Sequence, residues 1–340
     1  MSRSKNSRSN ADMKIFASIL ALLLALPGAT RAAGSEVGTS SGEFLKFGPD
    51  ARGVAMGHAM TSIAEDSSAI YWNPAGLAQV RQGHLTLSHG ALFQDVFYDF
   101  IAYARPIAPL VMPRRRFLRP SGLGTLAVSI QYLNAGRIEE RINTGVPSGG
   151  QFTPRDLAFT TAWGGALTEN LDLGLALKYI DSRISAVART GAIDGGVRYR
   201  SHLYDWPWTV GASAHNLGGT LSFDRQRDPL PVSFRFGNSL RPVEYLTLGA
   251  DFIMTRDHDP YVALGIEGLF AVEERIVVAL RGGYNGRNSS GDLDGLAGMS
   301  FGMGMKLNTL GFDYGWRPFG FLGSSHRLSL TWSFGKTVRR

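Results

Sequence analysis

Apolar and polar residues alternate along most of the chain after residue 84. In the segment 171–179, four leucines and a tyrosine alternate with Asp172, Gly174, Ala176 and Lys178. Successive side chains of a strand point to opposite faces, so this period of two predicts strands with one apolar face. We count about fourteen such segments, mostly of about nine to twelve residues, which is typical of bacterial transmembrane barrels. They begin near His84, Val96, Leu123, Arg155, Leu171, Thr190, Trp208, Val232, Tyr245, Tyr261, Arg275, Leu296, Thr309 and Arg327.

The composition of the two strand faces distinguishes a membrane barrel from a soluble sandwich, which would show the same alternation. The apolar rows are long, and aromatic residues gather near strand ends, as they do at membrane interfaces. These aromatic residues are Trp163, Tyr179, Tyr199, Tyr284, Trp316, Trp332 and Phe334. The opposite face combines small residues with isolated charges that need partners or water, so we expect it to face the lumen. The charged residues expected there are Lys178, Arg198, Arg235, Asp251, Glu267, Arg281, Asp313 and Arg317.

Connection lengths give a second argument for an outer-membrane barrel. With a periplasmic N-terminus, the connections after even-numbered strands are mostly short, and several after odd-numbered strands are long and Gly-rich. Such barrels have short periplasmic turns and longer external loops. The exception is the segment 106–122, which is nominally periplasmic but long, and which carries Arg114, Arg115, Arg116 and Arg119. An insertion and a shift of one in the strand count both explain it. A solvated turn is favoured over a contact with acidic headgroups or a partner.

The stretch Gly53–Val80 does not alternate. Ala55, Met56, Ala59, Met60 and Ile63 fall at helical spacing, and an Asn-Pro-Ala-Gly turn signal follows. We expect a small helical or irregular hatch packed inside the barrel. Its central motif is Trp72, Asn73, Pro74, Ala75, Gly76 and Leu77. A disordered lead is disfavoured, because such segments lack so many large apolar residues.

The N-terminus has the features of a secretory signal. A polar, basic segment 2–14 precedes the apolar run Ile15–Leu26 and a small-residue cleavage site after Ala32. A membrane anchor is the alternative, but a spanning helix needs about twenty apolar residues. We therefore expect a signal peptide at 1–32, a lead and hatch at 33–82, and a transmembrane barrel at 83–340, located in the outer membrane.

Three short segments carry a resemblance to a known family: Gly42–Gly48, Ala51–Gly57 and Ala69–Leu77. They resemble the N-terminal region of the PorV/PorQ proteins and, more distantly, of the FadL-type fatty-acid channels. The similarity covers about forty residues from Gly38 to Ala78, and beyond them the chain resembles the family only in its barrel-like patterning. The resemblance implies a fourteen-stranded barrel with an N-terminal hatch, acting with type IX secretion machinery or its cargo.

Composition narrows the chemistry. The 340-residue chain has no cysteine, which excludes disulfides and thiolate metal sites, and its charge of +7 does not indicate nucleic acid in an exported protein. Gly38–Gly42 matches a Gly-x-Ser-x-Gly elbow but lacks the strand that must precede it. The histidines are dispersed, and the acidic pairs Asp257/Asp259 and Asp292/Asp294 favour solvated loops over a calcium site. We expect no enzyme activity, metal or cofactor.

Three functions remain open. The first is a PorV/PorQ-like component that escorts or attaches exported proteins at the cell surface, which the segments near Phe44 and Met56 favour. The second is a FadL-like channel with a hydrophobic ligand in its lumen. The third is a structural barrel without transport. The partners are outer-membrane lipid and, depending on the function, secretion proteins, cargo or a hydrophobic ligand. A continuous apolar tunnel would favour the channel.

Overall fold

The computed structural model describes residues 40–92, 95–107, 123–141, 147–184, 186–223, 226–288, 296, 298–319, 323–335 and 337. The expected signal peptide at 1–32, the arginine cluster at 114–119 and the Asp292/Asp294 pair lie outside these residues. No helix within the described ranges is long and apolar enough to cross a membrane.

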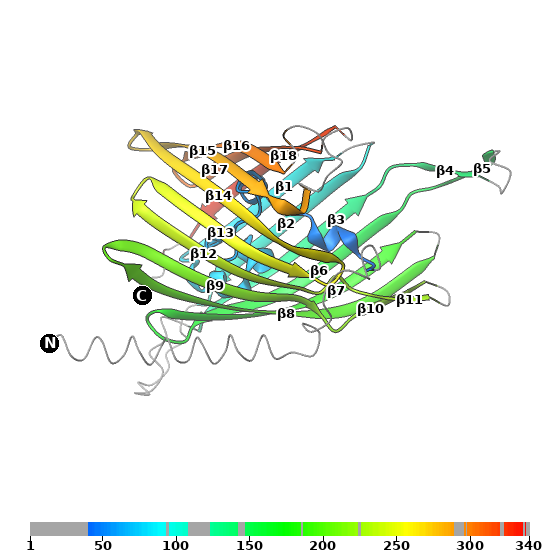
Figure 1. Cartoon of the computed structure of the whole chain (residues 1–340), viewed down its shortest axis with the longest axis horizontal. Coiled ribbons are helices and arrows are strands. Elements are labelled where there is room, and N and C mark those ends of the chain that lie inside the picture. Colours follow the sequence, from blue (N-terminus) through cyan, green and yellow to red (C-terminus); the bar gives the residue numbers. More distant parts are fainter. Residues whose placement is uncertain are drawn as a thin grey trace.

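The described strands form a closed antiparallel barrel of fourteen strands, as the sequence predicts (Figure 1). The largest differences in strand starts, such as Arg327 expected and Ser324 observed, are three residues. Pairing of the first and last strands from Gly83↔Phe334 to Ala91↔His326 closes the sheet and leaves no barrel edge. The barrel strands are β1 (Gly83–Ala91), β2 (Phe97–Pro106), β3 (Thr125–Asn134), β6 (Arg155–Ala166), β7 (Leu171–Arg183), β8 (Val187–Leu203), β9 (Trp206–Leu217), β12 (Ser233–Val243), β13 (Leu246–Thr255), β14 (His258–Glu273), β15 (Ile276–Asn285), β16 (Met299–Leu307), β17 (Leu310–Pro318) and β18 (Ser324–Phe334).

Two short ribbons lie within segments that the sequence suggested were loops. They pair β4 (Ile138–Arg141) with β5 (Pro147–Phe152), and β10 (Thr220–Phe223) with β11 (Gln226–Pro229). Figure 1 shows both at the same end of the barrel. We call this the ribbon end, and the opposite end, where short turns such as 307–310 join the strands, the turn end.

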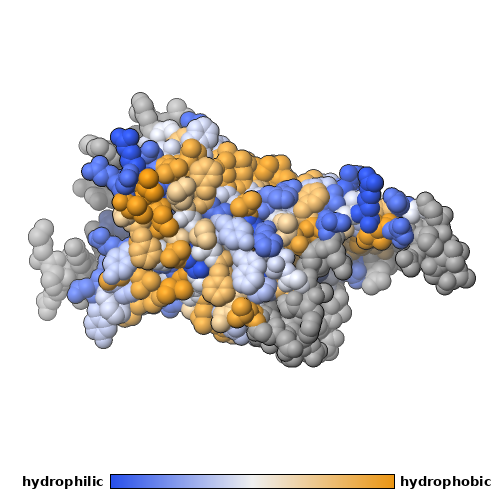
Figure 2. All heavy atoms as spheres, turned by 90° about the horizontal axis from the view of Figure 1, so that it is seen from above, coloured by the Kyte–Doolittle hydropathy of each residue, from blue (hydrophilic) through white to orange (hydrophobic). Residues whose placement is uncertain are grey.

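The apolar rows of the strands lie on the outer surface of the barrel. In β7, Leu175 is 61% exposed whereas the next residue, Ala176, is 1% exposed. Figure 2 shows hydrophobic residues over much of this outer wall. An exposed apolar band of this kind suits lipid contact in an outer-membrane barrel.

The hatch lies inside the barrel and is almost entirely buried. It consists of η1 (Glu43–Lys46), α2 (Ala51–Ala55), α3 (Ala69–Trp72) and η2 (Pro74–Gln79), and a further short helix, η3 (Gly286–Asn288), follows β15. The helical spacing that runs on to Ile63 does not extend the helix, because Gly57 and His58 adopt φ values of 63° and 74°. Such left-handed residues end a right-handed helix.

The hatch also touches the last strand of the barrel. The Ala51 N–H donates to Ser329 Oγ in β18 at 2.8 Å. Arg327 in the same strand donates to the carbonyls of Gly48 and Pro49. Strand β18 is therefore held by β1 through its backbone and by the hatch through its inward side chains.

Candidate functional site

A belt of glycines runs around most of the hatch, with one glycine on the inner face of each of ten neighbouring strands. A Cβ atom at any of these positions would lie 1.9–2.7 Å from a hatch atom, closer than real contacts allow. The hatch therefore packs directly on the strand backbones. This glycine belt consists of Gly164, Gly174, Gly196, Gly211, Gly237, Gly249, Gly265, Gly283, Gly302 and Gly315. Sequence reasoning recognised small inward residues but missed the belt, whose signal is a glycine recurring at one inward position of ten barrel strands.

The expected hatch motif sits against β7 and β8. A Cβ at Gly196 would lie 1.9 Å from Asn73 Oδ1, and one at Gly174 would lie 2.1 Å from the Pro74 carbonyl carbon. The Asn73 amide donates to the Thr61 carbonyl at 2.9 Å and its Oδ1 accepts from the Ala75 N–H at 3.1 Å. Asn73 is extended at φ −166°, and Pro74 starts η2. The turn is thus fixed from both sides.

The remaining motif residues are also buried: Trp72, Ala75, Gly76 and Leu77. Trp72 Nε1 donates to Asp50 Oδ1 at 2.7 Å. Gly76 leaves no room for a side chain, since its Cβ would lie 2.1 Å from the Ala64 carbonyl oxygen. All of these contacts hold the hatch together or against the wall.

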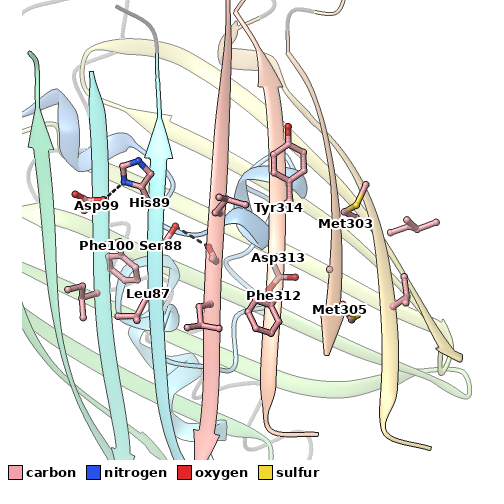
Figure 3. Close-up of a pocket in the computed structure, with 17 residues that line it drawn as sticks. Leu87, Ser88, His89, Asp99, Phe100, Met303, Met305, Phe312, Asp313 and Tyr314 are labelled. Carbon is pink, nitrogen blue, oxygen red and sulfur yellow. Dashed lines mark hydrogen bonds and ion pairs between the residues drawn. The ribbon is translucent and has the colours of Figure 1, made fainter. Parts of the chain in front are cut away.

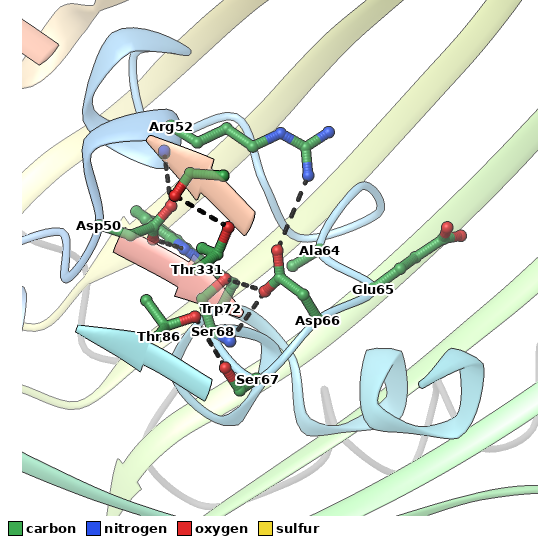
Figure 4. A network of polar contacts seen from close by, with 12 residues as sticks. Asp50, Arg52, Ala64, Glu65, Asp66, Ser67, Ser68, Trp72, Thr86 and Thr331 are labelled. Atoms are coloured by element: carbon green, nitrogen blue, oxygen red, sulfur yellow. Dashed lines mark hydrogen bonds and ion pairs between the residues drawn. The ribbon is translucent and has the colours of Figure 1, made fainter. Parts of the chain in front are cut away.

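Four charged residues form a network between hatch and wall at the turn end. Arg52 of α2 contacts both carboxylate oxygens of Glu267, at 2.8 and 2.7 Å. Arg281 bridges Glu267 and Asp313, at 2.7 Å each. The guanidinium of Arg52 also approaches Asp66 Oδ2 at 4.0 Å, as the dashed line in Figure 4 shows. The network therefore joins β14, β15 and β17 to the hatch through side chains.

This network borders a cavity of about 470 Å³, which we call the vestibule. Its lining includes the network residues together with His84, Lys306 and Thr331. Beside it, Arg198 of β8 donates to Glu65 at 2.8 Å and to the Ala64 carbonyl at 3.3 Å. The turn end of the lumen is thus polar and contains unfilled space.

A second polar cluster lies on β7, β8 and β9 towards the ribbon end. Lys178 contacts Asp194 at 2.7 Å. His215 joins Asp194 at 3.2 Å and Ser213 at 2.8 Å. The series Ser213–His215–Asp194 has the order of a hydrolase triad, but its members are at most 5% exposed. Ser213 also donates weakly to the Trp72 carbonyl, at 3.4 Å, so the hatch covers it.

Three expected lumen charges contact the hatch individually. Asp251 Oδ2 accepts from the N–H groups of Met60 and Thr61, at 3.1 and 3.0 Å. Arg317 lies 3.4 Å from His58 Nε2. Burial, followed by the charge of Arg317, holds the pKa of His58 well below its usual value, so the neutral ring accepts this bond. Arg235 lies against the rings of Tyr71 and Trp72.

The outer wall carries an apolar groove of about 910 Å³ across β1, β2 and β15–β18 (Figure 3). Its polar lining includes His89 and Asp99, which lie 2.7 Å apart, and Tyr314. Its apolar lining includes Leu87, Ile101, Leu280, Met303, Met305, Phe312 and Leu328. The groove and the vestibule share Gly304, Met305 and Asp313. One strand pair, β16–β17, therefore separates them.

The candidate sites for other chemistry do not assemble in the described ranges. The candidate elbow lies partly outside the described residues; of its described part, Ser40 Oγ lies 2.8 Å from Glu43 and 2.7 Å from Asp257, and Gly42 precedes the 3-10 helix η1. Within the described residues, no group of three acidic or histidine side chains could hold a metal ion. Near the ribbon end a cavity of about 10 Å³ shares no lining residue with the vestibule. The hatch separates the two.

Comparison with known proteins identifies the fold. No family model and no curated protein sequence matches the chain. The solved toluene transporter TbuX of Ralstonia pickettii superposes with a TM-score of 0.54 at 12% identity, covering 85% of this chain and 99% of that one. The toluene transporter TodX of Pseudomonas putida gives 0.53 at 10%, covering 84% and 96%. A FadL homologue of Pseudomonas aeruginosa gives 0.51 at 10%, covering 84% and 98%. The chain thus has the FadL-like outer-membrane barrel fold, and the closer PorV/PorQ likeness stays a prediction.

Proposed function

We propose that the protein is an outer-membrane channel for hydrophobic small molecules. The fold that it shares with two proteins named as toluene transporters supports this function over the secretion role that the PorV/PorQ resemblance implies. No contact among the described residues specifically favours secretion.

The observation that carries the proposal is the shared wall between the outer groove and the inner vestibule. Only the wall formed by β16 and β17 separates an apolar molecule in the groove from the lumen. At that point the wall is glycine: a Cβ at Gly304 would lie 2.2 Å from Asp313 Oδ1 and 2.7 Å from an Arg281 nitrogen. The ion pair of Arg281 and Asp313 therefore covers the inner side of a wall that has no side chain there.

The hatch supports a sideways route rather than a straight one. Its glycine contacts fill the middle of the lumen, and the two inner cavities share no lining residue. We propose that hydrophobic molecules pass between groove and vestibule where β16 and β17 part locally and the Arg281–Asp313 bridge moves aside.

A reversible staple across β16 and β17 tests this route. The natural chain has no cysteine, so the pair Met303→Cys and Tyr314→Cys, which face each other across the two strands, can be oxidised selectively. Cells whose own hydrocarbon channels are deleted would express the variant, and initial uptake of labelled toluene and of a long-chain fatty acid would be measured. We expect oxidation to abolish channel-dependent uptake and a reductant to restore it.

The matched control is Phe159→Cys with Tyr179→Cys across β6 and β7, where both side chains face outwards at 42% and 49% exposure. This staple should leave uptake unchanged. Equal loss from both staples would disprove the sideways route. The proposed function itself would be refuted if cells expressing the natural chain took up neither compound faster than cells with an empty vector.

A further inference from the structure

The small cavity near the ribbon end has three lining residues that carry hydrogen-bond donors without a partner. Its volume of about 10 Å³ has room for one occupant of the size of a water molecule. It lies where Leu45, Lys46 and Tyr71 of the hatch meet strands β7, β9, β12, β13 and β14. The residues that matter most here are Arg235, Tyr71 and Thr255.

Arg235 is the central feature of this cavity. The residue is 6% exposed, and its Nε and one terminal nitrogen have no hydrogen-bond partner. The Trp72 and Tyr71 rings lie 5.5 and 5.8 Å from its guanidinium carbon. In the described part of the chain, no carboxylate lies within ion-pairing distance of it. A buried charge without a counter-charge is costly, which indicates a missing partner.

Two neighbouring hydroxyls add to the surplus of donors. The Tyr71 hydroxyl lies beside the Arg235 guanidinium but makes no well-oriented hydrogen bond. Thr255 Oγ1 is likewise buried without a partner. Each hydroxyl can donate a proton, so the residues that line this space carry up to four unpartnered donor positions.

Three carboxylates lie near the cavity, and none of them forms an ion pair with Arg235. Asp194 pairs with Lys178 and His215, and Asp257 with Lys46 and Ser40. Asp251 accepts two hatch N–H groups and interacts with the charge of Arg235 through space, but it neither pairs directly with Arg235 nor lines the cavity. The local positive charge of Arg235 is therefore not neutralised by a direct contact.

We propose that this cavity binds a chloride ion, which links the hatch rings to strands β12 and β13. A chloride ion accepts several hydrogen bonds and supplies the missing negative charge, whereas a water molecule accepts two and leaves the guanidinium unneutralised. A carboxylate or phosphate group is too large for a space of about 10 Å³. The site does not depend on what the channel carries.

Bromide replacement tests occupancy directly. Crystals of the full chain grown in sodium bromide should show an anomalous peak in contact with Arg235 and Thr255. The proposal is overturned if the cavity shows no anomalous peak. Bromide found only on the protein surface, or a water molecule in the cavity, would be such a result.

Chloride dependence of stability provides the second measurement. At constant ionic strength, replacing gluconate by chloride should raise the melting temperature by about 2–4 °C per tenfold increase above the dissociation constant. Arg235→Gln should abolish this dependence. The control Arg241→Gln, on the same strand with a side chain 44% exposed, should keep it.

Because Arg235→Gln would also lose the chloride response if it failed to fold, a second variant keeps the positive charge of Arg235. Thr255→Val removes one donor and should shift the chloride response to several-fold higher concentration. A melting temperature of the natural chain that does not depend on chloride would overturn the proposal. It would also be overturned if both single variants, Thr255→Val and Arg235→Gln, kept the chloride response of the natural chain.

Discussion

The hatch meets two walls of the barrel in different ways. On β6–β8 it packs directly against the strand backbones, where Asn73 and Pro74 contact Gly164, Gly174 and Gly196. On β15–β17 the glycine belt continues, but towards the turn end the vestibule intervenes and Arg52, Glu267 and Arg281 bridge it. Close backbone packing cannot change partners without displacing the hatch, whereas ion pairs beside a cavity can re-form with other groups. The first wall therefore anchors the hatch, and the second can open.

Gly196→Val should have the largest effect, because it places a side chain where Asn73 Oδ1 now lies. We expect most of the protein to lose the compact, heat-modifiable barrel on gels, or to assemble with a hatch that protease cuts. The control is Gly191→Val in the same strand, whose Cβ would meet only the Lys178 carbonyl oxygen at 3.5 Å. Normal assembly of Gly196→Val would show that the anchoring wall tolerates displacement.

Leu175→Arg tests the outer side of the anchoring wall. An arginine on the lipid face near mid-bilayer should reduce the free energy of unfolding by about 2–4 kcal/mol. Denaturant titration in lipid vesicles measures it. Ala176→Ser, on the inner face, should change stability much less, and equal effects would mean that both sides of β7 are buried.

Asn73→Ala combined with Pro74→Ala should weaken the anchor without removing it. Loss of the amide that bonds the Thr61 carbonyl should cost about 1–3 kcal/mol, since that buried acceptor loses a partner. Liposome swelling should show only a small rise in leakage of sugars. If this variant leaks more than the next one, the contrast between the two walls fails.

Of the four variants, Arg52→Met should reduce stability least. It should nevertheless increase leakage more than the Asn73→Ala, Pro74→Ala variant does. Glu267 keeps Arg281 as a partner, so we expect a loss of about 1–2 kcal/mol. The hatch loses its bidentate link across the vestibule, and leakage of small solutes should rise clearly in the same swelling assay. Arg52→Lys, which retains one ion pair, should lie between this variant and the natural chain.

The sequence predicts the barrel because strand periodicity is local: every strand shows it within its own ten or so residues. The hatch was visible as a loss of that periodicity. Its helix was overextended, since no spacing rule reveals the positive φ values at Gly57 and His58. The ribbons were missed because four-residue strands such as Thr220–Phe223 carry too few residues to show a period.

The candidate site was harder to predict because it depends on the register of distant strands. In the sequence, each glycine of the belt is only one small residue among many. The belt becomes visible only when the register of the ten strands places these glycines side by side. Arg52 and Glu267 are 215 residues apart in sequence, so their pairing leaves no local pattern. The unpartnered nitrogens of Arg235 are likewise visible only once the hatch is in place.

The contacts of β18 have a consequence for the order of assembly. Its inward side chains bind the start of the hatch, at Gly48–Ala51, while its backbone completes the sheet against β1. Because the hatch precedes β1 in the chain, it can be captured before the final strand arrives. The hatch then serves as a template on which the two ends of the sheet meet, so a stopper enclosed by the finished barrel need never be threaded into it.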